Sequence, residues 1–171
     1  MKRMSTLLLL ALPLGLMSTT KTASLPIVKK ELNKENLYRE IVEQEIEYPD
    51  IVFAQAMLES GELKSKLAKM NKNLFGMRVP AKRKTSAIGK RYGHAVYSNW
   101  IQSVKDYKLY QDYVFKRKGQ LSYRSYLNHI NKTYAEVGDY VKRLNRVIKE
   151  HKHLIRSYEQ PKTLQEAYAA N

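Results

Sequence analysis

The sequence FAQAMLESGELKSKLAKMNKNLFGM, residues 53–77, is the most informative stretch of the chain because it joins an apolar helix to a turn-rich segment. Pro49 and Gly61 predict the ends of the helix, since proline is favoured in a first helical turn and glycine just after a last one. Between them the residues are apolar nearly all round, which indicates a buried helix. Glu59 would then lie in its last turn, beside a glycine.

Glu59 is suited to donating a proton from that position. The negative end of a helix disfavours a second negative charge, and burial disfavours the ionised form as well. Both effects would raise the pKa of the carboxyl group and keep it protonated near neutral pH. Glutamate is also a good helix former that usually faces solvent. Position alone therefore leaves an ordinary surface residue open as the alternative.

The composition bounds the class of protein. A chain of 171 residues with 43% hydrophobic residues is expected to form one domain. The absence of cysteine excludes disulfides, thiol catalysis and thiolate metal sites. His151 and His153 point to different sides of a helix, so no metal site is expected, and no cofactor either.

The formal net charge of +15 predicts polyanionic partners. Lys2 and Arg3 precede an apolar run at residues 7–17, which is typical of a signal peptide. We therefore expect export to the periplasm or beyond, where the partners are anionic wall polymers or a membrane surface rather than nucleic acid. We also expect a monomer. The predicted organisation is a signal peptide with the start of a spacer over 1–23, a spacer over 24–32, the domain over 33–158 and a tail over 159–171.

The hydrophobic periodicity predicts a mainly helical domain with one small inserted β-hairpin beside a cleft. Glycine-punctuated residues 79–97 are the expected hairpin. The expected helical segments are 33–46, 49–60, 65–70, 99–114, 122–132 and 139–157.

Four ordered blocks resemble bacterial glucosaminidase domains of glycoside hydrolase family 73, in the variant of Bacteroidetes wall hydrolases. The blocks are AQAMLESG at 54–61, NKNLFGM at 71–77, AVYSNWIQSVKDY at 95–107 and YAEVGDYVKRL at 134–144. The resemblance implies an α+β lysozyme-like fold. It also implies cleavage of the β-1,4 bond after N-acetylglucosamine in peptidoglycan.

By that resemblance Glu59 takes the place of the general acid. The turn at 73–76 is expected to shape the sugar-binding floor, and Tyr134 to line the site. Among the aromatic residues that follow, we expect Trp100 and Tyr107 in the core and Tyr97 nearer the cleft. The candidate substrate-binding residues are therefore Asn73, Phe75, Gly76, Tyr97 and Tyr134.

The expected hairpin departs from the family pattern because residues 79–97 contain no Asp or Glu. Glycoside hydrolysis ordinarily uses two carboxylates. Three explanations of the missing second carboxylate stay open. In the first, the substrate's own acetamido group serves as nucleophile, and in the second, Glu62 or Asp106 supplies the carboxylate. In the third, the chain is a non-catalytic basic module that binds wall glycan. In the first two explanations the protein is a glycoside hydrolase.

Overall fold

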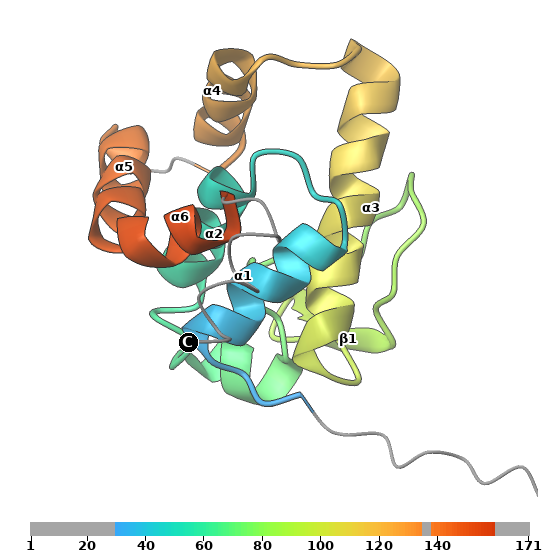
Figure 1. Ribbon diagram of the computed structural model, residues 1–171. Helices are drawn as coiled ribbons and strands as arrows, with labels where there is room; N and C mark the ends of the chain where they lie inside the picture. Colours follow the sequence, from blue (N-terminus) through green and yellow to red (C-terminus); the bar gives the residue numbers. More distant parts are fainter. Residues whose placement is uncertain (1–29, 135–137, 160–171) are drawn as a thin grey trace, which may run out of the picture.

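The computed structural model describes residues 30–134 and 138–159, which form a helical domain with one β-hairpin (Figure 1). The predicted fold class is thereby confirmed. The predicted signal peptide, residues 24–29 of the predicted spacer and residues 160–171 lie outside the described residues. In chain order the elements are α1 (Lys34–Glu43), α2 (Pro49–Glu59), the π-helical turn η1 (Leu67–Asn71), β1 (Gly89–Arg91), β2 (His94–Val96), α3 (Trp100–Lys118), α4 (Tyr123–Tyr134), α5 (Tyr140–Glu150) and α6 (Lys152–Glu159).

Helix α2 is the centre of the domain. Every residue over 51–57 is buried, as an all-round apolar sequence predicts. Helices α1 and α5 pack directly against it, and α3 and α4 stand beside it in Figure 1. A buried hydrogen-bonded chain ties three of these helices together: the Tyr107 hydroxyl of α3 donates to Gln55 of α2 at 2.7 Å and lies 2.8 Å from the Tyr126 hydroxyl of α4. Trp100 and Tyr107 lie in the core, as predicted.

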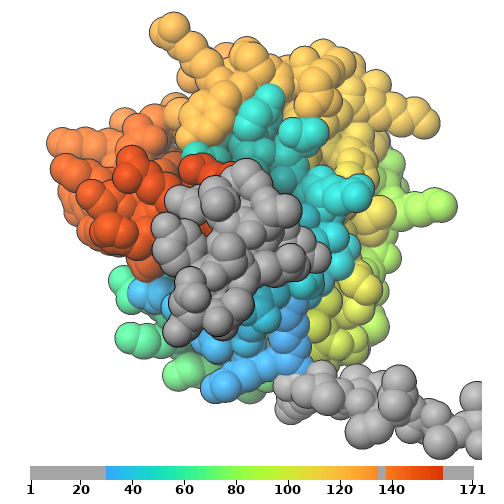
Figure 2. All heavy atoms as spheres, viewed as in Figure 1, coloured from blue at the N-terminus to red at the C-terminus, as the bar shows by residue number. Residues whose placement is uncertain are grey.

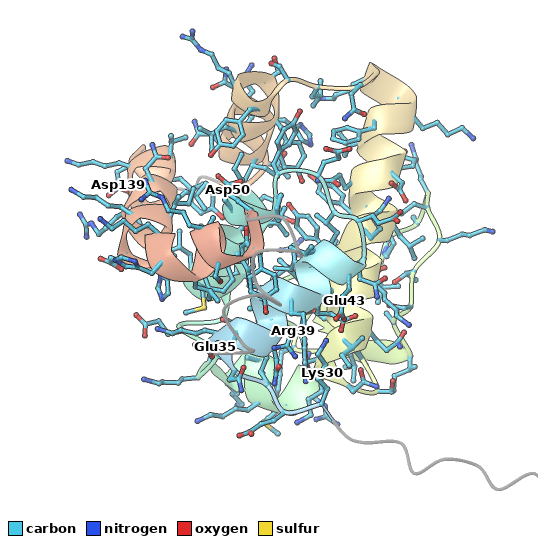
Figure 3. All side chains as sticks on the ribbon, in the orientation of Figure 1. Lys30, Glu35, Arg39, Glu43, Asp50 and Asp139 are labelled. Carbon is cyan, nitrogen blue, oxygen red and sulfur yellow. The ribbon has the colours of Figure 1, made fainter. Side chains whose placement is uncertain are left out.

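The N-terminal side of the domain is held by caps and ion pairs. The Asn33 side chain accepts a hydrogen bond from the Asn36 N–H and so caps α1. Lys30 forms ion pairs with Glu40 and Glu43 on α1, at 3.0 and 2.9 Å (Figure 3). These contacts place the first described residue against the helix.

The hairpin is shorter than predicted. Only Gly89–Arg91 and His94–Val96 pair, with Arg91 opposite His94 across a two-residue turn. Residues 78–88 form a loop instead, because side chains rather than a strand hold them against α3, as described below. The hairpin is joined to the segment after η1 by backbone hydrogen bonds from the Ala95 N–H to Met77 and from the Tyr97 N–H to Asn71.

Other helix boundaries also differ from the prediction, and α1 ends at Glu43 rather than at residue 46. Helix α3 continues to Lys118 and stops at Gly119, whose φ of +77° is readily adopted only by glycine. The segment predicted as one helix over 139–157 divides at His151 into α5 and α6. None of the described helices is both long and apolar enough to cross a membrane.

Candidate active site

Glu59 is the last residue of α2, and the chain turns sharply after it. The buried Ser60 hydroxyl accepts a hydrogen bond from the Leu63 N–H at 2.8 Å. Gly61, Glu62 and Leu63 all have positive φ, so the backbone cannot continue the helix. The side chain of Glu59 is half-buried and is thus held at the exit of the most buried helix.

The Glu59 carboxylate lines a cleft of about 740 Å³. Of the described residues that line it, Glu59 is the one acid, whereas Arg78 and Arg143 bring positive charge and Arg83 is paired with Asp106. The other lining residues are mostly apolar or aromatic: Leu58, Leu67, Phe75, Gly76, Met77, Val79, Pro80, His94, Tyr110, Thr133, Tyr134 and Tyr140. A single acid in a basic, aromatic cleft suits a carboxylate-bearing polymer of sugar rings.

Two tyrosines flank the carboxylate. The Tyr140 hydroxyl donates a hydrogen bond to Glu59 Oε1 at 2.8 Å. The Tyr134 ring lies nearly parallel to that of Tyr140, with centroids 6.5 Å apart and an angle of 12°. Burial, and then the charge of Glu59, raises the pKa of Tyr140 well above its ordinary value. Tyr140 is therefore a neutral hydroxyl that donates to the carboxylate.

Sequence reasoning missed Tyr140. The block YAEVGDY contains both tyrosines, and only Tyr134 was singled out. Tyr140 is the first residue of α5 and is only 4% exposed. A buried tyrosine at a helix end cannot be told from an ordinary core residue by its sequence position. The signal that could have revealed it is the pair of tyrosines on either side of a predicted helix break.

Gly76 and Phe75 form the floor of the cleft beside Glu59. Gly76 has a φ of +63°, and a β-carbon built there would lie 3.6 Å from Glu59 Oε2. Phe75 is fully buried and packs on Tyr107, with ring centroids 4.4 Å apart. Both residues line the cleft, as does Tyr134.

The structure gives Asn73 a different place from the expected sugar contact. Its side chain is fully buried and bonds only to backbone in the described contacts: the amide nitrogen donates to Met77 and Ala95 carbonyls, and the oxygen accepts from the Phe75 and Met77 N–H groups. These bonds satisfy the polar groups of the tight turn at 73–77. Asn73 thus holds the floor in place from beneath.

Tyr97 and Asp106 are also placed differently from the expectation. Asp106 is fully buried, and its carboxylate accepts three hydrogen bonds from the side chains of Arg83 and Tyr97. Two come from the terminal guanidinium nitrogens of Arg83, at 2.8 and 3.1 Å, and one comes from the Tyr97 hydroxyl, at 2.7 Å. Burial alone would raise the pKa of Asp106, but hydrogen bonds from Arg83, Tyr97 and Thr85 outweigh it and hold the pKa below the ordinary value of an aspartate. The network anchors the loop at 78–88 on α3.

Neither alternative second carboxylate is among the described residues that line the cleft. Asp106 belongs to the anchoring network, and Glu62 faces solvent with 63% of its side chain exposed, 3.9 Å from the Lys34 ammonium. Residues three positions apart lie on the same face of a helix only if the helix continues. Because α2 ends at Glu59, Glu62 does not lie beside Glu59 in this way. Within residues 30–134 and 138–159 no cluster of three or more potential metal ligands occurs.

Gly76→Ala should lower activity more than it lowers stability. Positive φ makes alanine unfavourable by about 1 kcal/mol, and the new methyl group would touch the Glu59 carboxylate. The matched control is Gly93→Ala, where φ is +77° and no atom lies within 4 Å of the added carbon. Thermal unfolding should show similar losses for both variants, and only Gly76→Ala should reduce release of reducing ends. Equal activities would contradict this placement.

Comparison with known proteins points to one family. The family model described as mannosyl-glycoprotein endo-beta-N-acetylglucosaminidase matches residues 35–153. A Staphylococcus aureus protein named N-acetylmuramoyl-L-alanine amidase domain-containing protein is 31% identical over 128 residues, in a match that covers 61% of this chain and 20% of that protein. The chain therefore spans about a fifth of this curated relative.

Solved structures were also matched. The catalytic domain of the autolysin Auto from Listeria monocytogenes is 20% identical, with a TM-score of 0.49 over 70% of this chain and 82% of that one. An N-acetylmuramoyl-L-alanine amidase from Staphylococcus aureus is 26% identical, with a TM-score of 0.49 over 71% and 40% of the two chains. A glycoside hydrolase domain of Salmonella typhimurium FlgJ is 17% identical, with a TM-score of 0.46 over 71% and 99%.

Proposed function

The chain belongs to the family of mannosyl-glycoprotein endo-beta-N-acetylglucosaminidases, and from this premise we propose that it is a glycoside hydrolase that cleaves peptidoglycan strands after N-acetylglucosamine. One observation carries the proposal: the Glu59 carboxylate lines the cleft and is held there by the Tyr140 hydroxyl. In this proposal Glu59 is the general acid. The N-terminal sequence pattern agrees with an exported enzyme that meets its substrate outside the cytoplasmic membrane.

The reaction needs one carboxyl group from the protein if the substrate supplies the nucleophile. Protonated Glu59 gives its proton to the glycosidic oxygen as the bond from that oxygen to the anomeric carbon breaks. The acetamido oxygen of the same N-acetylglucosamine attacks the anomeric carbon and forms a cyclic intermediate. Water then opens this ring and gives a proton back to the Glu59 carboxylate. The presence of one acid among the described lining residues supports this route.

Tyr140 positions the acid and stabilises the charge that appears on it. After proton transfer Glu59 is an anion, and a neutral hydroxyl 2.8 Å from Oε1 stabilises that anion. The parallel rings of Tyr134 and Tyr140 lie beside the reacting group and offer apolar faces to a sugar.

Tyr140→Phe should reduce the rate of cleavage by roughly 10- to 100-fold, since a hydrogen bond to a charged group contributes about 1.5–3 kcal/mol. The ring and its packing are kept, so the fold should remain. Because the acid loses a donor that favours its anion, the basic limb of the pH–rate profile, where the acid is deprotonated, should also move to higher pH. Tyr123→Phe is the control, since it removes a tyrosine–carboxylate bond of 2.7 Å to Asp50 on the exposed surface. An unchanged rate and pH profile for Tyr140→Phe would exclude the positioning role.

The proposed function is tested by incubating the protein with purified peptidoglycan. We expect new reducing ends in the soluble fraction, and mass spectrometry should identify N-acetylglucosamine as the new reducing sugar. An amidase would release peptides without new reducing ends, and a muramidase would leave N-acetylmuramic acid at them. A non-catalytic binding module would sediment with the polymer and release nothing.

A further inference from the structure

A second groove opens off the candidate active site. It has a volume of about 450 Å³ and lies between the loop before β1 and the C-terminal half of α3, which adjoin in Figures 1 and 2. Pro80, Arg83, Tyr110 and Thr133 line both the cleft and the groove, so the two hollows meet along these residues. The other described lining residues are Ala81, Lys82, Tyr113, Val114, Arg117, Lys118 and His129.

One face of α3 builds the wall of this groove. Its lining residues from Tyr110 to Lys118 recur at helical spacing, with aromatic and aliphatic side chains nearer the cleft and Arg117 and Lys118 at the far end. Tyr110 is fixed by the His129 ring, whose Nε2 lies 3.0 Å from the Tyr110 hydroxyl. The groove therefore has an apolar wall that leads to a basic end.

The cations at this end lack acidic partners within the described part of the chain. Arg83 is neutralised by Asp106, but no ion pair with a described carboxylate is found for Lys82, Arg117 or Lys118. Arg117 bonds to the Tyr113 hydroxyl at 2.8 Å, and the Lys118 ammonium lies 3.1 Å from His129 Nδ1. Burial and then the charge of Lys118 lower the pKa of His129, which makes it a neutral ring at pH 7. Three exposed cations therefore remain available to an anionic ligand.

We propose that this groove binds the carboxylate-bearing peptide stem of peptidoglycan while the glycan strand occupies the cleft. The inference rests on the proposed function. A wall glycan carries a short peptide on every second sugar, so an enzyme that holds the strand needs room for a branch beside its cleft. Alanine methyl groups of such a peptide fit an apolar wall, and its carboxylates complement Lys82, Arg117 and Lys118. The residues that the groove and the cleft share give such a branch a path out of the cleft.

The test compares two substrates and two charge-reversed variants of the whole protein. The substrates are stem-bearing peptidoglycan and glycan strands from which the peptides have been removed enzymatically. Arg117→Glu/Lys118→Glu alters the groove. Arg146→Glu/Lys149→Glu on α5 is the control, since it makes the same change of net charge at exposed residues that line neither hollow.

We expect the groove variant to raise KM for the stem-bearing polymer about fivefold at low salt and to leave cleavage of the stripped strands unchanged. The control variant should behave like the wild type on both substrates. Normal cleavage of stripped strands would also show that the groove variant is folded. Equal loss on both substrates, or no loss on either, would overturn the proposal.

Binding of a soluble stem tetrapeptide gives a readout that does not need catalysis. Calorimetric titration should detect binding of the peptide to the wild type and to the control variant. The groove variant should bind this peptide more weakly, and the wild type should bind a peptide with amidated carboxyl groups more weakly. If the wild type binds the peptide but releases no reducing ends, the proposed hydrolase activity is refuted and peptide binding by the groove is supported. If it cleaves stripped and stem-bearing strands equally well and does not bind the peptide, the groove proposal fails and the hydrolysis stands.

Discussion

Glu59→Gln should abolish release of reducing ends from peptidoglycan and leave the fold intact. The amide has the size of the carboxylate and can still accept the Tyr140 hydrogen bond, but it cannot donate a proton as an acid. General acid catalysis contributes about 10²–10⁴-fold, so the rate should fall by at least that factor. The measurement is an initial rate of reducing-end formation, with circular dichroism and thermal unfolding to show that the variant is folded.

Glu62→Gln is the matched control for Glu59→Gln. It makes the same chemical change three residues later, at a side chain that is 63% exposed and 3.9 Å from its one described ion-pair partner. We expect wild-type activity and a stability change within about 0.5 kcal/mol. A folded Glu59→Gln variant that cleaves at the wild-type rate would refute the assignment of the acid. Activity lost equally in both variants would point to Glu62 as a second catalytic carboxylate.

Asp106→Asn should be among the most destabilising single changes in the domain. It leaves the Arg83 guanidinium, whose side chain is 8% exposed, without the carboxylate that neutralises it. Removing one partner of a buried pair destabilises a fold by about 3–5 kcal/mol. The loop at 78–88 loses its anchor on α3 at the same time. Equilibrium urea unfolding measures the difference in the free energy of unfolding.

The destabilisation should depend on pH. The pKa of Asp106 is lower in the folded protein than in the unfolded chain, where an aspartate has a value near 3.9. The ionised network therefore stabilises the fold above that pH, and the stabilisation disappears as the pH falls through the lowered pKa. The gap in stability between wild type and Asp106→Asn should thus narrow below about pH 4.

Asp112→Asn is the control, since it removes a carboxylate from the same helix. Asp112 pairs with Lys108 at the surface and is 53% exposed, so its loss should change stability by less than about 1 kcal/mol. If Asp106→Asn were as stable as Asp112→Asn but had no activity, the result would indicate that Asp106 takes part in the reaction and does not serve as an anchor. Loss of stability with residual cleavage by the folded fraction supports the anchor.

The site shows how far side-chain chemistry could be predicted from single residues. A helix end, an apolar flank and a following glycine are local features that made Glu59 a candidate, and the family resemblance gave it the role of general acid. The resemblance also predicted Asn73 as part of the sugar-binding floor, although a polar residue in a turn is equally suited to bonding its own backbone. The structure places its side chain among backbone groups, where its oxygen is the one acceptor described for the Phe75 and Met77 N–H groups of the turn.

The mainly helical class, a buried helix that begins at Pro49 and ends before Gly61, and a hairpin after it could all be predicted from the sequence. These depend on periodicity and on turn residues, which act over a few positions. Which polar groups meet depends instead on how these elements pack. The Tyr140 hydroxyl reaches Glu59 across 81 residues of chain, and Arg83 reaches Asp106 across 23. Such partners are selected by the packing of α5 on α2 and of the loop on α3, and no local pattern specifies that packing.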